Sequence, residues 1–198
     1  MNYFLNLILY SFSKLAVAVF GAYFKVQSMA FMPVFGLNNG MIPIISYNYG
    51  AQKPDRMKRT MKLGVMVGCS IMVFCLAIMQ VFPGQILKIF DATDEMLLMG
   101  IPAVRIMSTA FIFAGFSVTC SGMFQAVGKG VYSMIVSMAR QLFVILPVAY
   151  FLSKAMNSVN GVWAAFPIAE VFSVIISTIF LLRVYKKIVK PMESVQRD

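Results

Sequence analysis

The sequence contains no histidine, and among its 198 residues only 7 are acidic and 3 are cysteine. Histidine is the commonest near-neutral proton carrier and a frequent metal ligand, so its absence argues against a metal site and against a histidine-dependent catalytic triad. Cys69 and Cys75 fall on one expected helix and point to different faces, which argues against a disulfide between them. We therefore expect buried free thiols, no cofactor and no enzymatic activity.

Charged residues of either sign are also scarce: 12% of the chain is charged and 60% is hydrophobic, with a mean hydropathy of +0.82. A soluble core cannot bury so much apolar surface. At roughly 20 residues per membrane crossing, about five or six spans fit this length. The composition predicts an all-α, polytopic membrane helical bundle of about six transmembrane segments.

Six apolar stretches separated by polar turns predict the positions of these spans. They cover residues 3–12, 15–49, 63–82, 96–126, 131–152 and 161–182. The first stretch has only about half the length that a crossing needs, so we interpret it as the end of a truncated span. We expect residues 1–190 to form a single transmembrane lobe and residues 191–198 to form a cytoplasmic tail.

Basic residues gather in some of the expected loops and not in others, although the net charge is +10. They cluster in 51–62, at the turn around Lys129 and in 183–190, whereas the loop before Glu95 is acidic. Cytoplasmic loops of membrane proteins carry the excess of Lys and Arg. The pattern therefore predicts a multi-pass protein of the cell membrane, here a bacterial inner membrane, with a cytoplasmic C-terminus. It does not indicate nucleic-acid binding.

The long second stretch contains helix-breaking and polar residues at membrane depth. They are Pro33, Gly36, Asn38, Asn39, Gly40 and Pro43. Proline removes a backbone donor, and such interruptions within a membrane are tolerated where they are covered by protein or line a cavity. We expect this segment to bend and to line a substrate cavity. Another small-residue pair, Gly64 and Gly68, is expected to serve close helix packing.

Four charged residues lie well inside the expected spans: Lys25, Arg105, Arg140 and Glu170. An unpaired charge at that depth costs at least a few kcal/mol, so we expect all four to face the bundle interior or water. Glu170 is the only acid among them. Two interpretations remain open: it neutralises one of the three cations as a fixed ion pair, or its protonation is coupled to transport.

Several motifs resemble those of the multidrug and toxic compound extrusion (MATE) transporters. Residues 25–27, 31–36, 43–51 and 55–56, with Gly40, are similar to the family's eighth helix and the loop after it; 121–129 resembles the end of the tenth, 140–141 the eleventh, and 161–163 with Glu170 the twelfth. The resemblance covers essentially the whole chain. It extends, however, only over the carboxy-terminal half of a family member.

The resemblance implies one lobe of a two-lobe transporter whose central cavity opens alternately to each side of the membrane. It also implies that Gln27 lies near substrate. Some family branches couple to cations through carboxylates on the seventh and tenth helices, but no acid occurs in 1–20 or 96–126. A coupling site for Na⁺ or H⁺ would then lie in the amino-terminal lobe. Lys25 stands where the family typically has arginine.

The function that this resemblance implies is secondary antiport, exporting amphipathic or cationic drugs and toxic compounds in exchange for Na⁺ or H⁺. The expected partners are membrane lipid, the amino-terminal lobe and small organic cations. One alternative is a flippase of the same superfamily for lipid-linked precursors, in which Lys25, Arg105 and Arg140 would contact phosphate. Another is a membrane scaffold fragment that does not transport.

Overall fold

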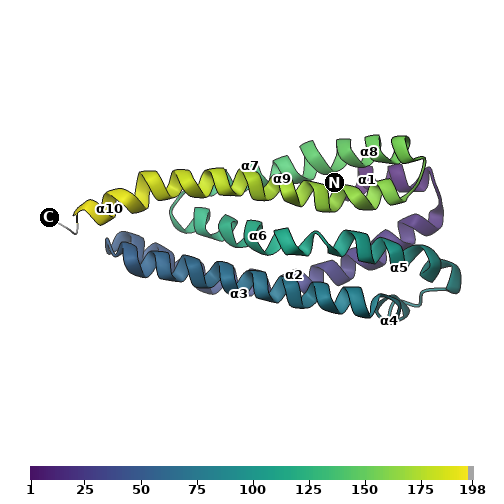
Figure 1. Ribbon diagram of the computed structural model, residues 1–198, viewed down its shortest axis with the longest axis horizontal. Helices are drawn as coiled ribbons and strands as arrows, with labels where there is room; N and C mark the ends of the chain where they lie inside the picture. Colours follow the sequence, from purple (N-terminus) through teal and green to yellow (C-terminus); the bar gives the residue numbers. More distant parts are fainter. Residues whose placement is uncertain (196–198) are drawn as a thin grey trace.

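The computed structural model describes residues 1–195, and the regular elements there are helices joined by short turns (Figure 1). In chain order they are α1 (Asn2–Tyr10), α2 (Lys14–Gly50), α3 (Pro54–Val81), α4 (Pro83–Lys88), α5 (Asp94–Ser108), α6 (Phe111–Ala126), α7 (Gly130–Met138), the π-helix η1 (Ala139–Val144), α8 (Ile145–Met156), α9 (Asn160–Val184), the π-helix η2 (Tyr185–Val189) and α10 (Lys190–Val195).

Four helical stretches in the described part of the chain are long and apolar enough to cross a membrane. They are Lys14–Gly50, Pro54–Val81, Gly130–Met156 and Asn160–Ser194. The pair α5 and α6 makes a fifth if its two halves, bent by 48°, count as one span. This arrangement confirms the predicted all-α membrane bundle, with four or five candidate spans besides the short α1.

Helix α2 remains helical for 37 residues, through both Pro33 and Pro43. It begins where the hydroxyl of Ser13 accepts a hydrogen bond from the Ala16 backbone N–H at 3.0 Å, a typical N-terminal cap. Both prolines are therefore accommodated within a continuous helix. A bend that keeps the helix continuous stays a prediction.

The polar connection after α2 is shorter than the expected loop 51–62. Helix α3 already begins at Pro54, and Asp55 lies in its first turn. Proline suits the first helical position because the N–H that it lacks would be unsatisfied there, and an acid in that turn interacts favourably with the helix dipole. Most of the basic cluster is therefore displayed on the first turns of a helix.

Helix α6 lies at the centre of the bundle, in contact with α2, α3 and α9, while α8 packs against α9 (Figure 1). One apolar core centres on Trp163, whose ring stacks on Phe20 with the centroids 6.5 Å apart. A second core surrounds Phe124, which meets Phe180 edge to face. The first core therefore joins α9 to α2, and the second joins α9 to α6.

The basic segments converge at one end of the molecule. Figure 1 shows the α2–α3 turn, the α6–α7 turn and α10 at the same end of the long axis. An ion pair of 2.7 Å between Lys58 Nζ and Glu193 Oε1 joins α3 to α10 there. The side of the membrane that this end faces stays a prediction. Within the expected tail, 191–195 continue the helix, and 196–198 lie outside the described residues.

Candidate functional site

One face of α2 lines a cavity of about 360 Å³. Residues three, four and seven positions apart share a helix face, and along this one Phe24, Phe31 and Phe35 alternate with the polar pair Gln27 and Ser28. Ser28 bonds its hydroxyl to the Phe24 carbonyl oxygen at 2.8 Å, so this part of its polarity is satisfied within the helix. The wall formed by α2 is thus largely aromatic, with one amide available to a ligand.

The opposite wall comes from η1, α8 and α9. Its lining residues are Arg140, Gln141, Ile145, Phe166 and Glu170, and Met1 and Met32 complete the cavity. A mostly apolar cavity with a few convergent polar groups is the usual form of a small-molecule site. Methionine and phenylalanine are adaptable contacts for ligands of varied shape.

The charged centre of this cavity is an ion pair between Arg140 and Glu170. Arg140 Nη1 donates to Glu170 Oε1 at 2.7 Å, and the two side chains are 20% and 8% exposed. Arg140 lies in π-helical η1, and single-turn π segments often occur at functional sites. Of the three cations expected as partners of Glu170, Arg140 is the one that pairs with it; the coupling role of Glu170 stays a prediction.

The second carboxylate oxygen of Glu170 is buried and has no hydrogen-bond partner within residues 1–195. The buried hydroxyl of Tyr23 also lacks a partner among these residues. An ionised carboxylate has several acceptor sites, and leaving them unused in an apolar environment is unfavourable. Glu170 is therefore a buried carboxylate with one oxygen held by Arg140 and the other without a partner among residues 1–195.

A smaller cavity of about 180 Å³ adjoins the first, since Phe35 lines both. It lies between α2 and α6 and includes Asn38, Asn39 and Gln125. Asn38 Nδ2 donates to the Val118 carbonyl oxygen at 2.9 Å. The predicted cavity residues Gln27, Asn38 and Asn39 are thus on one continuous surface of α2.

Gly122 makes the close approach of α2 and α6 possible. A Cβ atom at this position would lie 2.8 Å from Cγ of Asn38, which is closer than atoms of neighbouring side chains can approach. Any larger residue would displace the Asn38 amide from Val118. The glycine in the 121–129 motif therefore has a packing role beside the smaller cavity.

The remaining residues of the proline and glycine segment lie on the outside of this lobe. Pro33, Gly36, Gly40 and Pro43 are exposed, and a Cβ atom on either glycine would meet no atom of the described chain within 4 Å. This face is available to another part of a transporter or to lipid. The proposed helix-bending role of these four residues stays a prediction.

Lys25 and Arg105 are not part of either cavity. Both are exposed; the Lys25 ammonium lies 5.8 Å from the centroid of the Phe90 ring. The backbone carbonyl of Arg105 accepts a bond from Gln80 Nε2 at 2.8 Å, beside the break between α5 and α6. The four deep charges therefore separate into one buried pair and two exposed cations.

Neither the aromatic side of the larger cavity nor Ser28 is among the residues predicted from the sequence. The phenylalanines Phe24, Phe31 and Phe35 recur at helical spacing around Gln27, and this periodicity was the available signal. It was ambiguous because the chain has 18 phenylalanines, and helical spacing alone does not tell which of them line a cavity. The π-helical turn at Arg140 has no sequence signature of this kind.

Comparison with known proteins places this geometry in context. The MatE family model matches residues 1–151. The chain is 26% identical over 159 residues to the multidrug export protein MepA of Staphylococcus haemolyticus. The matched segment covers 80% of this chain and 35% of that protein. It is 28% identical over 166 residues to the MepA of Staphylococcus aureus strain bovine RF122 / ET3-1, covering 84% and 36%.

Solved structures agree with the fold. A multidrug resistance MATE family transporter of the MOP superfamily superposes with a TM-score of 0.87 in both its outward-facing and its inward-facing conformation, at 19% identity. The match covers 97% of this chain and 43% or 44% of that one. The chain spans about a third of the length of its curated relatives and less than half of these structures.

Proposed function

Because the chain belongs to the MatE family, we propose that it acts as the carboxy-terminal lobe of a secondary antiporter that exports amphipathic or cationic drugs. The proposed exchange ion is Na⁺ or H⁺. The observation that carries the proposal is the 360 Å³ cavity, whose aromatic α2 wall faces the Arg140–Glu170 pair. The relatives are multidrug export proteins by name, and this supports the same substrate class.

The cavity chemistry fits an organic cation with an apolar body. Phe31 and Phe35 place aromatic rings in the lining, and aromatic rings attract cations, while Glu170 supplies a carboxylate. Arg140 balances the negative charge of Glu170, so the carboxylate is not left as an unpaired buried charge between transport cycles. A bound cation would compete with Arg140 for the carboxylate, and this competition could be reversed when the substrate leaves.

A flippase for lipid-linked precursors finds less support in this arrangement. That function would use Lys25, Arg105 and Arg140 together on a phosphate, but Lys25 and Arg105 are exposed outside the cavity. Arg140 is already paired with a carboxylate. The drug exporter is therefore the better interpretation of this lobe.

Transport requires a second wall, so the proposed partner is the amino-terminal lobe of the same kind of transporter. The exposed face of α2 with Gly36 and Gly40 is the proposed contact with it, because glycines allow close helix approach. We place the basic end of the bundle in the cytoplasm, following the excess of Lys and Arg there.

This orientation can be checked by single-cysteine labelling in intact cells after the three native cysteines are replaced. A membrane-impermeant maleimide should react with Ala92→Cys, near the acidic turn, and not with Lys58→Cys. Labelling of Lys58→Cys alone would reverse the proposed orientation.

Binding of the fluorescent cation ethidium to the purified 198-residue chain tests the proposed site. Glu170→Gln should weaken binding about tenfold, because it removes a charged hydrogen-bond acceptor. Phe31→Ala should also weaken it. The matched controls are Glu193→Gln, a carboxylate at the basic end, and Phe74→Ala, an exposed phenylalanine on α3; neither should change the affinity.

Transport is measured in proteoliposomes with and without an amino-terminal lobe of a family member. We expect efflux of ethidium only when both lobes are present. Equal binding by wild type and Glu170→Gln would remove this residue from the site, and binding without two-lobe efflux would favour the scaffold function.

A further inference from the structure

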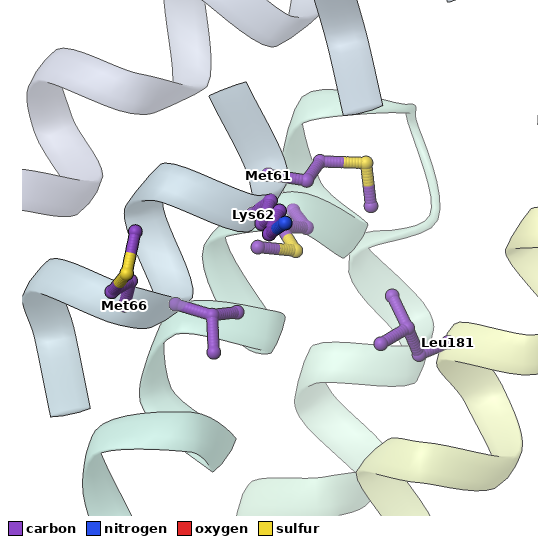
Figure 2. A pocket seen from close by; sticks show the side chains of 6 residues that line it. Met61, Lys62, Met66 and Leu181 are labelled. Carbon is purple, nitrogen blue, oxygen red and sulfur yellow. The ribbon is translucent and has the colours of Figure 1, made fainter. Parts of the chain in front are cut away.

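A groove at the basic end of the bundle lies outside the site described above. It has a volume of about 350 Å³ and is formed by Met61, Lys62, Val65 and Met66 of α3, Met123 of α6 and Leu181 of α9 (Figure 2). Met123 is buried, whereas Met66 is 53% exposed. The groove is therefore a furrow on the surface of the bundle, floored by α6, and it shares no residue with the larger cavity.

Lys62 is the charged side chain that lines this groove. Within residues 1–195 no carboxylate lies within ion-pair distance of its ammonium. One turn away, Lys58 differs: its ammonium contacts Asp55 at 2.9 Å and Glu193 at 2.7 Å. Lys62 thus leaves a cation at the edge of an almost wholly apolar groove for an external anion, while its neighbour Lys58 is already neutralised.

The surroundings of the groove are strongly basic. Residues 53–62 contain five basic side chains and one acid, and residues 183–193 contain four basic side chains and one acid. The excess lies on the first turns of α3 and on the last turns of the long helix that contains α9. An anion near this end meets favourable charge from both sides of the groove.

Polar and apolar positions follow the same order on both walls. On α3 the basic residues end at Lys62, and Val65 and Met66 lie further along the helix, away from the basic end. On α9 the apolar Leu181 likewise lies further from the basic end than Arg183. A phospholipid has this order as well, with its phosphate at the membrane surface and its acyl chains toward the midplane.

We propose that this groove binds an anionic phospholipid from the leaflet at the basic end, with the phosphate on Lys62 and one acyl chain along Val65, Met66 and Leu181. Basic pockets between transmembrane helices are suited to anionic headgroups. An organic cation would be repelled by Lys62, so the groove is not a second drug site. The proposal does not depend on the transport function.

Native mass spectrometry of the full chain, purified with equal amounts of phosphatidylglycerol and phosphatidylcholine, measures the preference. We expect phosphatidylglycerol to be retained preferentially. Lys62→Gln should reduce that preference about fivefold, which is the effect of one basic side chain near an anionic surface. The matched control Lys53→Gln removes an exposed cation outside the groove and should leave the preference nearly unchanged.

Photolabelling of the wild-type chain locates the lipid independently of any variant. Phosphatidylglycerol with a diazirine on its acyl chain should label residues 61–66 and Leu181, and excess unlabelled phosphatidylglycerol, but not phosphatidylcholine, should compete. Val65→Trp, which fills the groove, should abolish the labelling of these residues. Equal retention of both lipids, or equal effects of Lys62→Gln and Lys53→Gln, would overturn the proposal.

Discussion

The packed face of α3 and the open face of α2 use the same small-residue spacing for different purposes. A Cβ atom on Gly64 of α3 would collide with the Met41 sulfur of α2, and one on Gly68 with the Thr119 hydroxyl of α6. Gly36 and Gly40 of α2 meet no described atom within 4 Å. Four-residue spacing of glycines therefore predicts that a face can be packed closely, and it does not tell what packs there.

The two faces also differ in polarity. The α3–α6 contact is closed by small side chains and backbone, and Thr119 bonds its hydroxyl back to the Gly115 carbonyl oxygen at 2.7 Å. The α2 side carries amides and borders two cavities. The closely packed contact and the side that borders the cavities should therefore respond differently to substitution.

The largest loss of stability is expected for Gly115→Leu. A Cβ atom at Gly115 lies 3.0 Å from both the Cys69 Cα and the Gly68 carbonyl oxygen, so α3 and α6 must move apart. Because the neighbours are backbone atoms and cannot rotate away, we expect a cost of about 3 kcal/mol or more. Thermal unfolding in detergent measures it. The control Gly40→Leu should unfold near the wild-type temperature, and similar losses in both variants would contradict the distinction between the two faces.

Arg140→Leu should produce the next largest effect, because it leaves the buried Glu170 without its cation. Separating a buried pair in this way costs about 3 kcal/mol. The double variant Arg140→Leu, Glu170→Leu should recover much of that loss, since an apolar pair of similar volume is well tolerated. A thermal-unfolding cycle with both single variants tests this, and additive effects would show that the pair contributes no coupling energy.

Asn38→Ala should have a moderate effect of about 1 kcal/mol, because it removes the hydrogen bond to the Val118 carbonyl oxygen. The neighbouring Asn39→Ala is the control, since Asn39 is exposed. Thermal unfolding should separate the two variants by several degrees. A larger loss of stability for Asn39→Ala than for Asn38→Ala would contradict the structural role assigned to Asn38.

The smallest effect on stability is expected for Gly36→Ala and Gly40→Ala, within about 0.5 kcal/mol of wild type. Alanine favours the helix and meets open space at both positions. If this face contacts the amino-terminal lobe, both variants should nevertheless lower ethidium efflux in the two-lobe reconstitution. Unchanged efflux would place the lobe contact elsewhere.

Much of the fold follows from local patterns in the sequence. Spans are long apolar runs, and their ends carry prolines, glycines and charges, so the bounds of α2 and α9 lie close to the predicted ones. The connection 51–62 was predicted too long because charged residues such as Arg56 occur equally well in a loop and on the first turns of a helix. The break at residues 109–110, which bends the α5–α6 pair by 48°, contains neither proline nor glycine and gave no signal.

The sequence by itself determined that this chain is a membrane bundle with one basic end, because membrane insertion depends on hydrophobicity and charge along the chain. It also limited the deep charges to four residues. Only the tertiary structure decided that Glu170 pairs with Arg140 and that Lys25 and Arg105 remain exposed. These residues are far apart in sequence, and whether two charges meet depends on helix rotation and packing, which no single helix encodes.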